Sequence, residues 1–286
     1  MRFRPLRPLY ASRLVAPLLA AALLAGCAAF SAGAHGPDVP VARRVAALLP
    51  TDVLLLGEQH DAPEHHALER ETVQALAGRG QFAALALEMA EEGRSSARLP
   101  ADATDAQVQT ALGWSDKAWP WTRYGPSVMA AVRAGVPVVG ANLPRARMKD
   151  AMADVSLDVQ LNGEAYTMQQ EAVREGHCKL LPESQIGPMT RIQVARDRAM
   201  AQAVVKARQP GKTVLLIAGA GHVTKVLGVP QHLPTDVSVK TVRLQAGGPA
   251  EDDTAAYDAT WRTPAMPEKD YCAELRQPTQ PATKRP

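Results

Sequence analysis

Four short apolar runs that each end near a polar residue constrain the fold of this chain most. They cover residues 53–56, 82–87, 136–139 and 214–217. Continuous apolar runs of this length are typical of strands that are buried on both faces, as in parallel sheets. Helix-start signals at Asp61 and Pro63 follow the first run, so strands and helices are expected to alternate. The sequence therefore predicts an α/β fold with a mostly parallel sheet flanked by helices.

Polar residues follow these runs at the points where the strands should end. They are Glu58 and His60, Glu88, Asn142, and His222. The first and last runs both end in a Gly-x-x-His motif. Because parallel strands place their carboxyl ends at one edge of a sheet, where ligands bind, these five side chains should converge.

Two imidazoles and two carboxylates in one place would suit a divalent metal ion such as zinc. The candidate metal ligands are His60, His222, Glu58 and Glu88. A metal-bound water could act as the nucleophile. The carboxylate that does not bind the metal could act as the general base, and Asn142 or Arg145 could donate to the oxyanion. This hypothesis describes a divalent-metal-dependent hydrolase of peptidase or esterase type, with Glu58, Glu88, Asn142 and Arg145 as catalytic residues. The alternative is that the histidines have only structural roles.

The segment after the first strand is predicted to form a helix over residues 63–77, with Leu68, Ala75 and Leu76 on its apolar face. His65 and His66 lie on this helix. One of them could face the strand ends, but we expect both on the solvated face.

The first 26 residues have the pattern of a signal peptide. Four arginines precede an apolar stretch from 14 to 24, and the segment has no acidic residue. The stretch is too short to span a bilayer comfortably. Removing this segment leaves 28 of the 32 basic residues against 29 acidic ones. The nearly neutral remainder gives no reason to expect nucleic acid as a partner.

The signal peptide ends in Leu-Ala-Gly-Cys27, which resembles the lipobox of bacterial lipoproteins. The resemblance implies that Cys27 is lipidated and that residues 27–40 form a tether to the membrane. The protein would then lie in the cell envelope facing the periplasm, with the outer membrane favoured because Ala28 lacks an acidic retention signal. The alternative is an ordinary secretory signal with an incidental cysteine.

Export also bears on the other two cysteines. An oxidising compartment favours a disulfide between Cys178 and Cys272. The alternative makes Cys178 a thiolate ligand, since it follows His177 directly.

The remaining patterns divide the chain into regions. Residues 41–272 should form one α/β domain, in which about 148–209 is a helical subdomain without a clear strand. A helix is expected over 126–134, a final strand over 237–244, and a disordered tail over 273–286. Trp114, Trp119 and Trp121 either pack on the sheet edge or form an aromatic rim over a ligand pocket.

Several of these motifs together resemble the ChaN-like haem-binding lipoproteins of the Tiki and TraB-type superfamily. They are Gly57–His60, Leu87-Glu88, Asn142–Arg145, Arg196-Asp197 and Gly219–His222, within a resemblance that spans about residues 48–244. It implies an α/β sheet with a helical subdomain, haem as cofactor, a role in haem or iron uptake, and a homodimer that encloses stacked haems.

The resemblance also implies where haem would bind. Haem in this family lies on the helical subdomain, where the iron is held by tyrosine with help from histidine. The residues of this chain that match that region are Tyr166, Met168 and His177. His177 is our first candidate for the iron ligand; the alternative is that it caps a helix or packs beside the disulfide.

Overall fold

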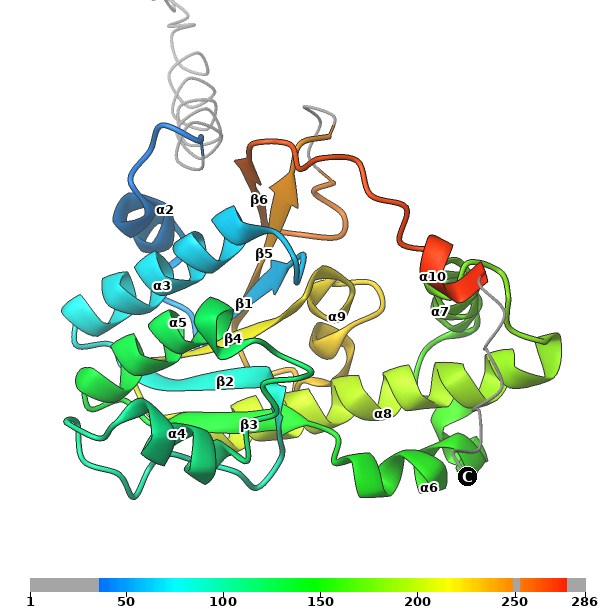
Figure 1. The fold of residues 1–286 in the computed structure, drawn as a ribbon, viewed down its shortest axis with the longest axis horizontal. Coiled ribbons are helices and arrows are strands. Elements are labelled where there is room, and N and C mark those ends of the chain that lie inside the picture. Colours follow the sequence, from blue (N-terminus) through cyan, green and yellow to red (C-terminus); the bar gives the residue numbers. More distant parts are fainter. Residues whose placement is uncertain (1–35, 249–252, 277–286) are drawn as a thin grey trace, which may run out of the picture.

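Six strands of the described chain form one parallel sheet (Figure 1). The computed structural model describes residues 36–248 and 253–276. The strands are β1 (Val53–Glu58), β2 (Phe82–Glu91), β3 (Val138–Asn142), β4 (Thr213–Gly219), β5 (Val239–Ala246) and β6 (Ala259–Thr263). Their order is β3-β2-β4-β1-β5-β6, which places β1 and β4 side by side in the middle. The predicted α/β fold is confirmed.

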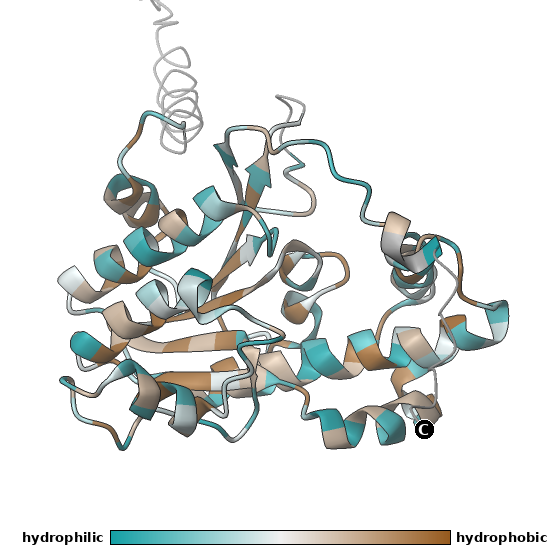
Figure 2. Cartoon of the chain, in the orientation of Figure 1, coloured by the Kyte–Doolittle hydropathy of each residue, from teal (hydrophilic) through white to brown (hydrophobic). Residues whose placement is uncertain are grey.

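Helices cover both faces of this sheet, and the strands between them are mostly hydrophobic (Figures 1 and 2). One face packs against α2 (Val41–Leu48), α3 (Pro63–Gly78), α4 (Asp105–Leu112) and α5 (Trp121–Arg133). The other face packs against the C-terminal half of α8 (Glu183–Ala207). Since neighbouring side chains on a strand point to opposite faces, Leu54 and Leu56 enter the first core and Leu55 enters the second. Burial on both faces explains the unbroken apolar runs in the sequence.

The buried face of α3 is wider than the predicted one, on which Leu76 is buried and Ala75 packs against the core. His65, His66 and Glu69 are buried on it, whereas Leu68 is only partly buried. The expectation that both histidines lie on a solvated face was therefore wrong. Polar side chains on the buried face of α3 disguise its amphipathic pattern, because the apolar residues alone indicate a narrower face.

The structure also corrects several boundaries. A sixth strand, β6, follows the predicted final strand and pairs with β5 at the edge of the sheet. It was missed because it has only five residues, of which Trp261 is the one large apolar side chain buried completely. The third strand continues to Asn142, and α5 begins at Trp121 with Pro126 inside it.

The C-terminal half of the chain supplies a separate group of helices. Residues 148–209, the helical subdomain, contain α6 (Met148–Ala153), the 3₁₀ helix η2 (Val155–Val159), α7 (Gly163–Gly176) and α8. The N-terminal half of α8 extends beyond the sheet and carries α6 and α7 (Figure 1). Small and medium apolar residues form a core of their own there, including Leu157, Ala165 and Val194.

Some of the predicted segments fall outside the described residues. These are the signal peptide, Cys27 with most of the tether, and positions 277–286. The first residues of the predicted tail instead form a short helix, α10 (Ala273–Arg276). Among the described residues, no helix is both long enough and apolar enough to span a membrane.

Candidate functional site

The five predicted polar residues come together at one edge of the sheet, although β2 continues past Glu88 to Glu91, with a register shift against β3 between Leu87 and Glu91. This strand-end cluster consists of Glu58, His60, Glu88, Asn142 and His222. The ring of His60 lies between Glu58 and Glu88, at 2.8 Å from Oε1 of the first and 3.9 Å from Oε2 of the second. The ring of His222 approaches Glu88 Oε1 to 3.6 Å. The predicted convergence is confirmed.

Glycines make this close approach feasible. Gly219 ends β4, and its N–H donates a hydrogen bond to Glu88 Oε2 (2.7 Å). A Cβ atom at Gly219 would come within 3.0 Å of His60 Nε2. A Cβ at Gly57 would collide with Val223, at 2.3 Å from its side chain. Gly57 must therefore lack a side chain so that β1 can pack against residues 220–223, whereas a side chain at Gly219 would require the ring of His60 to shift.

Glu88 is the centre of the cluster and is only 2% exposed. Arg196, on α8, forms a short ion pair with its carboxylate, and Asn142 Nδ2 donates to its backbone carbonyl (2.9 Å). Burial raises the pKa of this carboxyl, but the charges of His222, Arg196 and His60 outweigh burial and lower the pKa to about 2. Glu88 is therefore an anion held by several donors.

His222 is oriented by a second residue of α8. Its Nδ1 lies 2.6 Å from Asp197 Oδ1, and Asp197 is 2% exposed. Burial lowers the pKa of His222, but Asp197 and Glu88 outweigh burial and raise it. Burial also lowers the pKa of His60, but Glu58 and Glu88 outweigh burial, so this pKa is raised as well. The cluster is a network of alternating charges.

The contacts of the cluster do not favour the predicted hydrolytic metal centre. Arg196 and Gly219 already occupy both carboxylate oxygens of Glu88. The Oδ1 atom of Asn142 accepts from Arg196 Nε (3.0 Å), so this amide is engaged at both ends. The side chain of Arg145 is exposed. It lines a cleft of about 410 Å³ together with Glu88, Arg196 and Trp119.

The tryptophans fit both interpretations offered by the sequence. Trp114, Trp119 and Trp121 pack on the core formed by α3, α5 and the sheet. Trp119 also lies edge-on to the ring of His60, with 4.9 Å between the centroids, and lines the cleft. It therefore covers one side of the strand-end cluster.

Sequence reasoning missed two residues that contact Glu58 from the helices. Tyr124 on α5 donates its hydroxyl to Glu58 Oε1 (3.0 Å), and burial and then Glu58 raise its pKa. Glu69 on α3 is fully buried, and burial together with Glu58 raises its pKa well above the ordinary value. The available signal was the spacing of His66 and Glu69, which puts them on one face of a helix.

The helical subdomain contains the three residues matched to haem binding, and they have different surroundings. Tyr166 donates its hydroxyl to Asp158 (2.7 Å) and is partly buried against the core of the subdomain. Burial, followed by Asp158, raises its pKa to about 12. Met168 is an exposed side chain. These two residues stand two positions apart on α7, so they point in nearly opposite directions.

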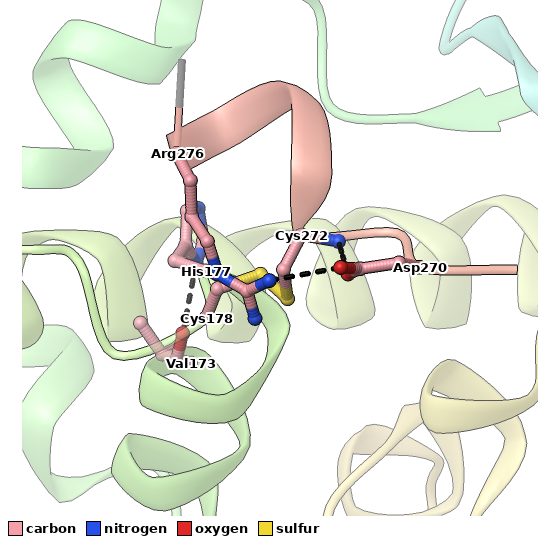
Figure 3. Close-up of a disulfide and its surroundings, with 6 residues drawn as sticks. All are labelled: Val173, His177, Cys178, Asp270, Cys272 and Arg276. Atoms are coloured by element: carbon pink, nitrogen blue, oxygen red, sulfur yellow. Dashed lines mark hydrogen bonds and ion pairs between the residues drawn. A yellow bond between two sulfur atoms is a disulfide. The ribbon is translucent and has the colours of Figure 1, made fainter. Parts of the chain in front are cut away.

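His177 ends α7 beside a disulfide (Figure 3). Its Nδ1 lies 2.8 Å from the carbonyl oxygen of Val173. Since a carbonyl oxygen can only accept, the proton sits on Nδ1 and the lone pair on Nε2. No described side chain forms a hydrogen bond with Nε2.

The predicted disulfide joins Cys178 to Cys272. It ties the C-terminal segment, residues 264–276, to the end of α7, beside which α10 lies (Figures 1 and 3). The same segment contacts the loop that carries His60: Tyr271 donates its hydroxyl to Asp61 (3.2 Å) and accepts from Gln59 (3.1 Å). The bonded state excludes Cys178 as a thiolate ligand in this structure.

Comparison with known proteins identifies the family. Residues 44–233 match the model of a family described as haem-binding uptake, Tiki superfamily, ChaN. The chain belongs to this family. The match covers both the strand-end cluster and the helical subdomain.

One solved structure agrees with this assignment. A structure that describes cofacial haem binding to ChaN of Campylobacter jejuni is 27% identical, with a TM-score of 0.63; the match covers 75% of this chain and 88% of that chain. More distant are the type III effector HopBA1 (16% identity, 81% and 96% coverage, TM-score 0.45) and RRSP, a MARTX toxin effector domain from Vibrio vulnificus (16% identity, 79% and 38% coverage, TM-score 0.42). No curated protein matches the chain.

Proposed function

We propose that this chain is a lipid-anchored envelope protein that binds haem on its helical subdomain and takes part in haem or iron uptake. The observation that carries the proposal is the match of residues 44–233 to a haem-binding uptake family. The ChaN structure of Campylobacter jejuni, which describes cofacial haem binding, supports it.

His177 fits the role of an iron ligand. A histidine that binds a metal commonly donates its other ring nitrogen to a carbonyl or carboxylate, which fixes the ring. The hydrogen bond from Nδ1 to Val173 has this form and leaves the Nε2 lone pair available. Haem would supply an iron centre, and His177 would hold it through this nitrogen.

The other two candidates fit supporting roles better. The hydroxyl of Tyr166 is engaged by Asp158. Met168 lies nine residues before His177, which is about 13 Å along a helix axis and on the opposite side. His177 and Met168 of the same chain therefore could not both hold one iron.

Exposed apolar side chains on the subdomain support a surface for haem and for a second copy of the chain. Val155 is 66% exposed and Val159 is 79% exposed, and Met168 and Leu180 are also exposed. Val155 and Val159 lie on η2, which contacts α7, the helix that carries Met168. A contiguous exposed apolar patch commonly marks a binding surface. We propose a homodimer that covers part of this region when haem is bound.

Titration of the purified protein with hemin tests the function. We expect a shifted Soret band that saturates at a fixed ratio of hemin to protein. Light scattering during size-exclusion chromatography should show a dimer with hemin, and Val159→Ser should weaken it. An unshifted Soret band at micromolar protein would contradict the proposal.

The anchor needs a separate test. Cys27→Ser should abolish incorporation of labelled fatty acid and release the protein from the membrane fraction. The matched control is Cys178→Ser with Cys272→Ser, which leaves the proposed lipidation site intact. Equal membrane association of the Cys27→Ser protein and the wild type would contradict the lipid anchor.

A further inference from the structure

A second group of ligand-type side chains lies deeper than the strand-end cluster. We call Glu58, His66 and Glu69 the inner triad. Glu58 comes from the end of β1, and the other two come from the buried face of α3. Their ligand atoms all lie within 4.8 Å of one another. Among the described residues, these two acidic side chains and one histidine are spaced closely enough to hold a metal ion.

The polar atoms of the inner triad are incompletely paired. Glu58 and Glu69 are 2% and 0% exposed. Glu58 uses Oε1 to accept from His60 and Tyr124, but its Oε2 has no hydrogen-bond partner. This Oε2 atom lies 3.6 Å from His66 Nδ1. Leaving a buried oxygen of Glu58 without a donor is costly, and a cation bound to it would satisfy it.

The distances within the triad suit coordination better than hydrogen bonding. His66 Nδ1 lies 3.6 Å from Glu58 Oε2 and forms a long hydrogen bond of 3.3 Å with Glu69 Oε2. Charge-assisted hydrogen bonds between such groups are about 2.7–2.9 Å long. Ligands at about 2.1 Å from a tetrahedral zinc ion are about 3.4 Å apart, which is close to both separations.

The charges of the triad also favour a cation. Two carboxylates and one imidazole are the nitrogen and oxygen ligands that zinc takes, and three protein ligands leave a fourth position open. Zn²⁺ would offset two neighbouring buried carboxylates. The imidazole of His60 pairs with the other oxygen of Glu58, Oε1.

We propose that Glu58, His66 and Glu69 bind one divalent transition-metal ion of the zinc type, inside the fold and separate from haem. Such an ion would link α3 to the end of β1. It would also fix the carboxylate of Glu58, which positions His60. The inference does not depend on the proposed function.

Zinc binding by the full chain, purified without a histidine tag and stripped with EDTA, tests this site. Calorimetry with zinc chloride should give one equivalent of tight binding in the wild type. We expect Glu69→Gln and His66→Gln to weaken it at least 100-fold. The matched control Glu64→Gln, an exposed position on the same helix, should bind as the wild type does, and so should His222→Gln.

Two results would overturn the inference. One is the absence of stoichiometric zinc binding to the wild type; the other is unchanged binding by folded Glu69→Gln. If these variants do not fold, zinc K-edge absorption of the loaded wild type decides. One imidazole with oxygen ligands supports the triad, whereas two imidazoles would assign the ion to His60 and His222 and contradict it.

Discussion

The strand-end cluster and the helical subdomain differ in how far their side chains are buried and paired. In the cluster, buried carboxylates are surrounded by donors from four elements, and Glu88 alone is contacted by Arg196, Gly219 and two histidines. The helical subdomain exposes valines and carries a histidine whose Nε2 has no described partner. In the first arrangement the charge of Glu88 is satisfied by its neighbours, and the second arrangement offers apolar area and one nitrogen ligand. For this reason we assign haem to the subdomain.

The largest expected effect is on the cluster. Glu88→Ala should lower the free energy of unfolding by about 3–5 kcal/mol, because it leaves the charges of Arg196 and His222 buried without their partner. Denaturant titration measures the loss. A change below about 1 kcal/mol would show that the cluster does not depend on this carboxylate. It would contradict the view that the cluster, unlike the subdomain, is stabilised by its own charge pairs.

The cluster should also make stability depend on pH. The folded pKa of Glu88, about 2, is below its ordinary value of 4.5. The stabilisation is therefore complete above about pH 4.5 and is lost as pH falls towards 2, amounting to about 3 kcal/mol. Unfolding measured from pH 6 to pH 2 should show this loss in the wild type and less of it in Glu88→Gln. Parallel curves would contradict the assignment.

Removing the disulfide should affect the subdomain more than the cluster. The bond joins residues 94 positions apart. It fixes a peripheral segment, so we expect Cys178→Ser with Cys272→Ser to cost about 2 kcal/mol, at the low end of the usual range. Hydrogen exchange should rise in residues 264–276 and near His177. Equal increases across β1 and β4 would contradict this local effect.

The smallest effect should come from Tyr166. Tyr166→Phe removes one hydrogen bond to Asp158, which Arg191 still pairs with (2.8 Å). We expect a loss of about 1 kcal/mol in stability and little change in hemin affinity. A strong loss of affinity in a fully folded variant would transfer the ligand role from His177 to Tyr166.

The sequence predicted the strand ends more accurately than the helical surfaces. Buried parallel strands produce unbroken apolar runs, so the positions of Glu58, Glu88 and His222 could be read directly. α3 has polar residues on its buried face, so the burial of His66 and Glu69 could not be read from apolar spacing. β6 was missed because an edge strand of five residues needs few apolar side chains. The contacts of His177 depend on the turn after α7, which spacing alone does not define.

Hemin affinity of two matched histidine variants tests the central claim most directly. If haem binds the helical subdomain, His177→Ala should weaken hemin binding at least tenfold and move the Soret band, while His222→Ala should keep the affinity of the wild type. The opposite pattern, with loss of binding only in folded His222→Ala, would place haem at the strand-end cluster and contradict the account.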